Sequence, residues 1–145
     1  MASIISVDNI RATGTSTNAI TIDSSNNLGD ITMNAEGGTG TLSVRQGVAK
    51  AWINFNGTGT PATRDSLNAS SLTDDSTGKF TLTFSSAMDN DDFAAVTSGG
   101  SSGTSAMMGY MYSPATSSVK LEYVSASNAL ADPVFGTSDV NGDLA

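Results

Sequence analysis

The chain contains neither cysteine nor histidine among its 145 residues. Without cysteine it has no disulfides, thiolate metal sites or cysteine nucleophiles. Without histidine it lacks the commonest general base at neutral pH and the commonest zinc ligand, which excludes a serine-histidine triad and the usual zinc hydrolase sites. Glutamate occurs only at positions 36 and 122. We therefore expect no catalytic residues, no cofactor and no metal, and we keep paired carboxylates for glycoside hydrolysis as a disfavoured alternative.

Positive charge is also scarce, since 14 acidic residues stand against 6 basic ones and the net charge is −8. The basic residues are scattered along the chain: Arg11, Arg45, Lys50, Arg64, Lys79 and Lys120. This distribution predicts no binding to nucleic acid, which requires a clustered basic face. The first residues carry no basic and apolar signal pattern, and no stretch approaches 18 apolar residues. We therefore expect neither a secretory signal nor membrane insertion.

Serine and threonine are abundant, with 40 of the 145 positions, and hydrophobic residues make up 38%. Disordered chains combine low hydrophobicity with many charges and few β-branched or aromatic residues. In this chain Val, Ile, Thr, Phe and Tyr alternate with polar residues, which is typical of strands. The composition therefore predicts an ordered all-β protein.

The first third contains a spacing typical of a repeat, because apolar residues lie at 20, 31 and 42 and again at 22, 33 and 44, an interval of 11. Segments rich in Asn and Gly separate these units and favour tight turns. Strands of three or four residues are too thin to bury their own apolar face. We therefore predict that residues 1–46 form a β-repeat stem for attachment and oligomerisation, with a homotrimer as the expected assembly and another cyclic oligomer as the alternative. The alternative is a three-stranded meander packed on the C-terminal domain.

Residues 47–145 have longer and more aromatic strands and predict an antiparallel β-sandwich or jelly-roll-like domain. A strand at 48–56 has apolar residues on both faces, and the strand at 79–85 shows the clearest period-two alternation. Further strands are expected at 93–97, 106–112, 119–124 and 134–135, with a surface loop at 98–103 and little helix.

The strand at 106–112 concentrates methionine and tyrosine. Alternation places Met108, Tyr110 and Tyr112 on one face and Met107 and Met111 on the other. We expect one face in the core and the other at a subunit or partner contact, since Met and Tyr are common at interfaces.

Two acidic segments offer oxygen ligands for a cation. Residues 139–143 (Asp-Val-Asn-Gly-Asp) match the first half of a calcium loop, although no bidentate glutamate follows, and a polar C-terminal tail is the favoured interpretation. Residues 89–92 (Asp-Asn-Asp-Asp) are explained equally well as an acidic turn. The glycine-rich segments at 37–41 and 57–60 lack the lysine and helix of a nucleotide loop, so we interpret them as strand turns.

Residues 49–96 hold the only tryptophan and four of the five phenylalanines. Within them, the segments at 50–55, 56–60, 64–68, 70–74, 77–84, 87–88 and 93–96 carry a family resemblance. This pattern resembles a module of tailed-bacteriophage virion structural proteins, especially tail-fibre-like proteins of marine phages. The resemblance implies no catalytic residues.

The resemblance implies a non-enzymatic virion protein, made in the host cytoplasm, whose partners are other capsid or tail proteins. The chain is shorter than most phage fibres, which favours a short trimeric fibre or appendage, or a capsid decoration (cement) protein. The alternative is a carbohydrate-binding β-sandwich module that acts as a host-surface adhesin.

Overall fold

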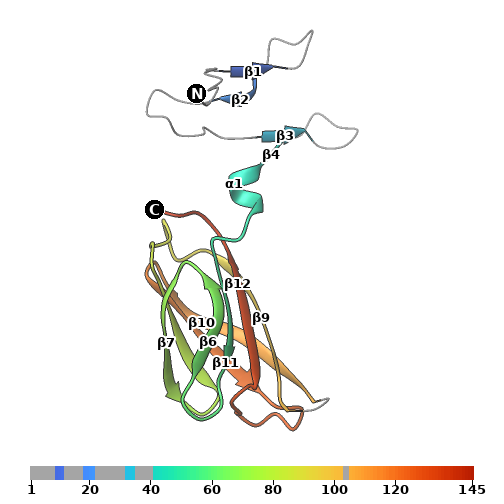
Figure 1. Cartoon of the computed structure of the whole chain (residues 1–145), viewed down its shortest axis with the longest axis vertical. Coiled ribbons are helices and arrows are strands. Elements are labelled where there is room, and N and C mark those ends of the chain that lie inside the picture. The colour runs from blue at the N-terminus through green and yellow to red at the C-terminus, as the bar shows by residue number, and fades with distance from the viewer. Residues whose placement is uncertain (1–8, 12–17, 22–31, 35–40, 103–104) are drawn as a thin grey trace, which may run out of the picture. The chain divides into compact units, whose positions relative to one another are not determined.

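The computed structural model describes residues 9–11, 18–21, 32–34, 41–102 and 105–145 (Figure 1). The chain divides into two units, Met1–Val48 and Ala49–Ala145. Each unit is described by itself below.

The described residues of the first unit form two small antiparallel sheets. Strand β1 (Asn9–Arg11) pairs with β2 (Asn18–Thr21), and β3 (Thr32–Asn34) pairs with β4 (Thr41–Ser43). One helical turn, α1 (Val44–Gly47), follows directly. Strands β2, β3 and β4 overlap the three predicted units, whereas the spacing did not predict β1, and Val44 begins a helical turn instead of ending a strand. The 11-residue repeat and the stem that it would build stay predictions.

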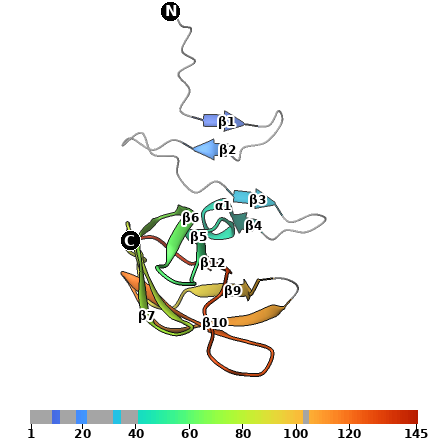
Figure 2. The same cartoon turned by 60° about the horizontal axis from the view of Figure 1, so that its bottom comes forward.

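The second unit is one eight-stranded sheet in which every neighbouring pair is antiparallel (Figures 1 and 2). The spatial order is β6-β5-β12-β9-β10-β11-β8-β7. In chain order the strands are β5 (Ala51–Asn56), β6 (Ala62–Leu67), β7 (Ala69–Ser76), β8 (Lys79–Phe84), β9 (Ala94–Gly100), β10 (Ala106–Ala115), β11 (Ser118–Val124) and β12 (Phe135–Asn141).

The two edge strands of this sheet, β6 and β7, follow one another in the chain with only Asn68 between them. The backbone at Asn68 has φ of 54°, in the left-handed region that Asn tolerates better than most residues. Because consecutive strands form opposite edges, the sheet must curl until it is nearly closed into a barrel. The all-β antiparallel class is therefore confirmed, but one curled sheet stands where the sequence predicted a two-sheet sandwich or jelly roll.

The interior of the second unit is filled by alternate side chains of its strands. Three aromatic rings form its centre, since Phe55, Phe80 and Tyr123 are fully buried and pack edge to face at centroid distances of 5.1 to 6.0 Å. Alternation in β5 and β8 points every second residue inward, as the burial of both strands shows. Trp52 therefore projects from the outer face of β5, on the side opposite Ile53.

The predicted surface loop at 98–103 is wrong for its first three residues, because Ser98, Gly99 and Gly100 belong to β9 and pair with both β10 and β12. Glycine at 99 has a packing reason there. A Cβ on Gly99 would lie 2.8 Å from Cδ1 of the buried Tyr123 ring. The close approach of this ring to the backbone therefore requires a residue without a side chain.

The predicted polar tail at 139–143 is also wrong for its first three residues. Residues 139–141 belong to β12, which lies in the sheet between β5 and β9. Ser138 and Val140 of this strand are buried, and Asp139 between them is exposed. The residues of β12 are mostly small and polar, so the sequence does not predict that this strand lies inside the sheet. They fit there because large rings of neighbouring strands fill the space beside them.

Candidate functional site: a groove on the outer face of the sheet

Three neighbouring strands, β5, β12 and β9, bring outward side chains together from distant parts of the chain. Their register places Asp139 opposite both Trp52 and Val96, and Thr137 opposite both Asn54 and Ser98. Two cross-strand rows result. These rows are Trp52–Asp139–Val96 and Asn54–Thr137–Ser98.

The six side chains, with Ile53 and Ser138, line a shallow groove of about 390 Å³, which we call the Trp52 groove. Trp52 is half-buried and Val96 is 72% exposed, so apolar surface lies at both ends of the first row. The second row contributes an amide and two hydroxyls. Asp139 is the one carboxylate among the lining residues.

Each polar group of the Trp52 groove is held by a neighbour. Arg64 donates from Nη1 to Oδ1 of Asn54 at 3.3 Å. The hydroxyls of Ser98 and Thr137 share a hydrogen bond of 3.0 Å, and Asn141 donates from Nδ2 to Oδ1 of Asp139 at 3.0 Å. These bonds fix the side chains on a regular sheet, which lowers the entropic cost of ordering them around a ligand.

Arg64, part of the segment that carries the family resemblance, links β6 to the start of β12. Its guanidinium donates to the carbonyl oxygens of Phe55 and Val134, each at 2.7 Å. It also lies 4.7 Å from the centre of the Phe135 ring. Arg64 therefore stabilises the wall of the groove and is not itself a lining residue.

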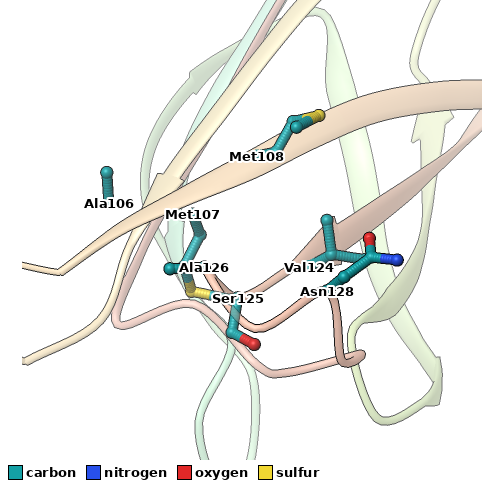
Figure 3. A pocket seen from close by; sticks show the side chains of 7 residues that line it. All are labelled: Ala106, Met107, Met108, Val124, Ser125, Ala126 and Asn128. Carbon is teal, nitrogen blue, oxygen red and sulfur yellow. The ribbon is translucent and has the colours of Figure 1, made fainter.

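A second pocket of about 440 Å³ lies where β10 and the end of β11 meet the turn at 125–128 (Figure 3). Its lining is Ala106, Met107, Met108, Val124, Ser125, Ala126 and Asn128. Met107 and Met108 leave β10 in opposite directions, so Met107 is buried and Met108 is 68% exposed (Figure 3). The predicted alternation of this strand is thus confirmed. Met108 also pairs with Ser98 of the Trp52 groove, so the two pockets are neighbours.

A polar network lies on the same outer face, over β10, β11 and β8. The Tyr110 hydroxyl donates to Glu122, and Lys79 Nζ lies 3.1 Å from the second carboxylate oxygen of Glu122. The hydrogen bond from Tyr110, together with Lys79, holds the pKa of Glu122 below its ordinary value. Lys79 also lies over the Tyr112 ring at 5.7 Å. These partners satisfy one another, which is typical of a solvated sheet face.

The two predicted cation sites are joined by one backbone hydrogen bond, from the Asp89 amide to the Asp143 carbonyl at 2.8 Å. In residues 89–92, the Asn90 side chain accepts a hydrogen bond from the Asp92 backbone at 2.9 Å, as in an acidic turn. In residues 139–143, Asp139 lies on the outer face, and Asp143 accepts a backbone bond from Asp89. Within the described residues, no group of three or more acidic side chains could hold a metal ion, and no helix is long and apolar enough to cross a membrane.

The sequence places Trp52 in a mostly apolar strand and Asp139 in a tail or cation loop, so it does not predict the Trp52 groove. One signal was present. Ala51, Ile53 and Phe55 alternate as an inward set, which leaves Trp52 and Asn54 to face outward. The positions 52, 96 and 139 become neighbours only through the register of three strands.

The sequence matches no protein-family model and no curated protein. One solved structure is similar to the chain: the phiAB6 tailspike in complex with three-repeated oligosaccharides of the Acinetobacter baumannii surface polysaccharide. The TM-score is 0.56 at 15% sequence identity, and the match covers 98% of this chain and 31% of that one. The chain thus spans about a third of the length of this tailspike. At this identity the likeness establishes a shared fold.

Proposed function

We propose that this chain is a structural component of a bacteriophage virion, located in a tail appendage or on the capsid. The observation that carries the proposal is the fold likeness to the phiAB6 tailspike, which extends over 98% of this chain. The segments at 49–96 that resemble phage virion modules support the same assignment from the sequence.

The proposed virion protein is a homotrimer whose first unit forms the assembly or attachment region. Strands β1 to β4 are three or four residues long and pair as two 2-stranded sheets. An isolated two-stranded sheet is at best marginally stable in water, whereas copies from several chains can bury their apolar faces together. A short fibre and a capsid decoration protein both fit this arrangement.

The proposed role is non-enzymatic. Glycoside hydrolases use two carboxyl groups about 5 to 9.5 Å apart. Asp139 and Asp65 are the carboxylates in and beside the Trp52 groove, and they lie on strands separated by β5 and in different rows. Asp139 and Asp65 are therefore not directly opposite one another across any strand pair. Incubation with host-surface polysaccharide should release no new reducing ends, and their release would contradict this part of the proposal.

The virion assignment is tested by the protein composition of purified phage particles. Peptides of this chain should co-purify with infectious particles through a density gradient, at a fixed ratio to the major capsid protein. Their absence from particles, with the protein abundant in the infected lysate, would refute the assignment.

A second candidate function is binding of a host-surface glycan. The Trp52 groove favours it, because an aromatic side chain beside amide, hydroxyl and carboxylate groups is the combination that sugar rings require. The tailspike of similar fold is itself in complex with oligosaccharides. A glycan array without a hit would count against this function and leave the virion assignment intact.

A further inference from the structure

We propose that the Trp52 groove binds uncharged oligosaccharides, with one sugar ring stacked on Trp52 and its hydroxyls bound by Asp139 and by the Asn54–Thr137–Ser98 row. The proposal rests on the second candidate function and assigns its site and ligand class.

The apolar part of the site is the first row. Trp52 and Val96 lie on either side of Asp139 on the regular outer face of the sheet. Sugar rings present C–H groups on their faces and hydroxyls around their edges, so they pack on an aromatic ring and bond sideways. A carboxylate next to the indole is well placed to accept the hydrogen bonds of edge hydroxyls, and bonds to charged acceptors are the stronger ones.

The polar part of the site retains free bonding capacity. Arg64 donates to Oδ1 of Asn54, and Asn141 donates to Oδ1 of Asp139. In the described contacts, the Asn54 Nδ2 amide and the second Asp139 oxygen remain available to a ligand. The groove therefore offers a donor on Asn54 and an acceptor on Asp139, which are diagonal neighbours on adjacent strands. This pair suits sugar hydroxyls, because a hydroxyl both donates and accepts.

Charge decides which sugars fit. Asp139 lies in the groove, and Asp65 of β6 lies beside it, opposite Asn54. Arg64 borders the groove through its bond to Asn54, and two backbone carbonyls and the Phe135 ring also occupy its guanidinium. The net charge of −8 adds repulsion at long range. Sugars that carry carboxylates or phosphates should therefore be excluded.

The single tryptophan of the chain makes the test direct, because all tryptophan emission comes from this groove. The full-length protein is applied to an array of neutral and acidic glycans, and neutral hits are titrated by Trp52 fluorescence. We expect neutral oligosaccharides to bind and to change the emission in a saturable way. Binding without a change in emission, selective binding of acidic glycans, or an array without hits would overturn the proposal.

Three variants complete the test. Trp52→Leu should weaken binding at least tenfold, and Asp139→Asn about tenfold. Tyr110→Leu is the matched control, because it makes the same kind of change at a 42% exposed aromatic residue on the same face, outside the groove. It should leave the affinity within twofold. Equal losses in Trp52→Leu and Tyr110→Leu would contradict the site.

Two further results separate the possible causes. If Trp52→Leu does not fold, as judged by circular dichroism, the fluorescence titration of the unmodified chain decides the matter alone. If light scattering shows that Trp52→Leu or Asp139→Asn dissociates an oligomer, a second copy of the chain occupies the groove and the glycan proposal falls. In that case, and in the case of an empty array, the chain's presence in purified particles still upholds the virion assignment.

Discussion

Gly99 and Gly100 are neighbours in β9 but meet different surroundings. A Cβ at position 99 would lie within 3.1 Å of two atoms of the Tyr123 ring, whereas the nearest atom of a described residue to one at position 100 is the Ser105 carbonyl oxygen, at 3.9 Å. Because Tyr123 is fully buried, its ring has no room to withdraw.

We therefore expect Gly99→Ala to lower the free energy of unfolding by about 1 to 3 kcal/mol. Gly100→Ala in the same strand is the control and should change it by less than about 0.5 kcal/mol. Urea unfolding followed by circular dichroism measures both values. Equal effects at the two positions would show that the ring does not pack against Gly99 as described.

Tyr123 also predicts how stability depends on alkaline pH. Burial raises the pKa of its phenol well above the ordinary value of about 10, and its hydroxyl donates to the Thr137 carbonyl at 3.2 Å. Above about pH 10 the unfolded chain loses this proton and the folded chain keeps it. The contribution of this group to stability is thus fully present below pH 10 and declines as the pH rises.

Tyr123→Phe should cost about 1 kcal/mol at pH 7, from the lost hydrogen bond. The stability advantage of the parent over this variant should then shrink above pH 10, by up to about 1.4 kcal/mol per pH unit. Chemical unfolding of both proteins between pH 7 and 11 measures this difference. A constant advantage across that range would show that the phenol is not shielded from water.

At the scale of the strands, the corner at Asn68 decides whether the sheet closes. Asn68 joins the two edge strands with φ of 54°, and its side chain accepts a bond from the Ser86 amide at 2.6 Å and donates to the Ser86 carbonyl at 3.0 Å. Both the backbone and the side chain of this residue therefore hold the corner.

We expect Asn68→Ala to lower the free energy of unfolding by about 2 to 3 kcal/mol, since alanine disfavours positive φ and has no group to bond Ser86. Asn68→Gly should cost less, because glycine accepts this backbone conformation. Thermal unfolding of the two variants gives the order. Asn68→Ala as stable as the parent would contradict the closed corner.

The strands differ in how far the sequence predicted them. Strand β8 was predicted because Phe80, Leu82 and Phe84 alternate with polar residues, and each of the three is buried. Strands β6 and β7 were missed because most of their side chains are exposed Thr, Ser and Asp, which leave no alternating apolar set. A sequence analysis takes polar edge strands of this kind for loops. Their polar side chains protect the edges of the sheet from pairing with other chains.

The order of the strands could not be predicted from the sequence for a related reason. Strand β12 lies between β5 and β9, but its inward residues Gly136, Ser138 and Val140 are small. Their fit depends on rings from other strands, such as Phe55, whose Cζ would lie 2.5 Å from a Cβ at position 136. The Trp52 groove could not be predicted from the sequence for the same reason, because both of its rows include a residue of β12.

At the scale of the whole molecule, the two units should differ in what they need to be stable. Among the residues whose burial is described, the core cluster, from Ala51 to Val140, lies within the second unit. The described strands of the first unit have three or four residues each. Assembly between chains should therefore depend on the first unit.

We expect the full chain to have the mass of a trimer by light scattering, and a fragment that begins at Ala49 to fold and to have the mass of one chain. Circular dichroism of the fragment checks that its sheet is intact. A full chain with the mass of one copy, or a fragment that still forms trimers, would contradict the assembly role of the first unit.

The central claim is that this chain is part of a phage particle, and imaging of intact particles at residue resolution tests it most directly. The account predicts density for the eight-stranded domain, with Trp52 on its outer face, in groups of three copies on the tail or the capsid. Particles that contain no density for this fold at any position would contradict it.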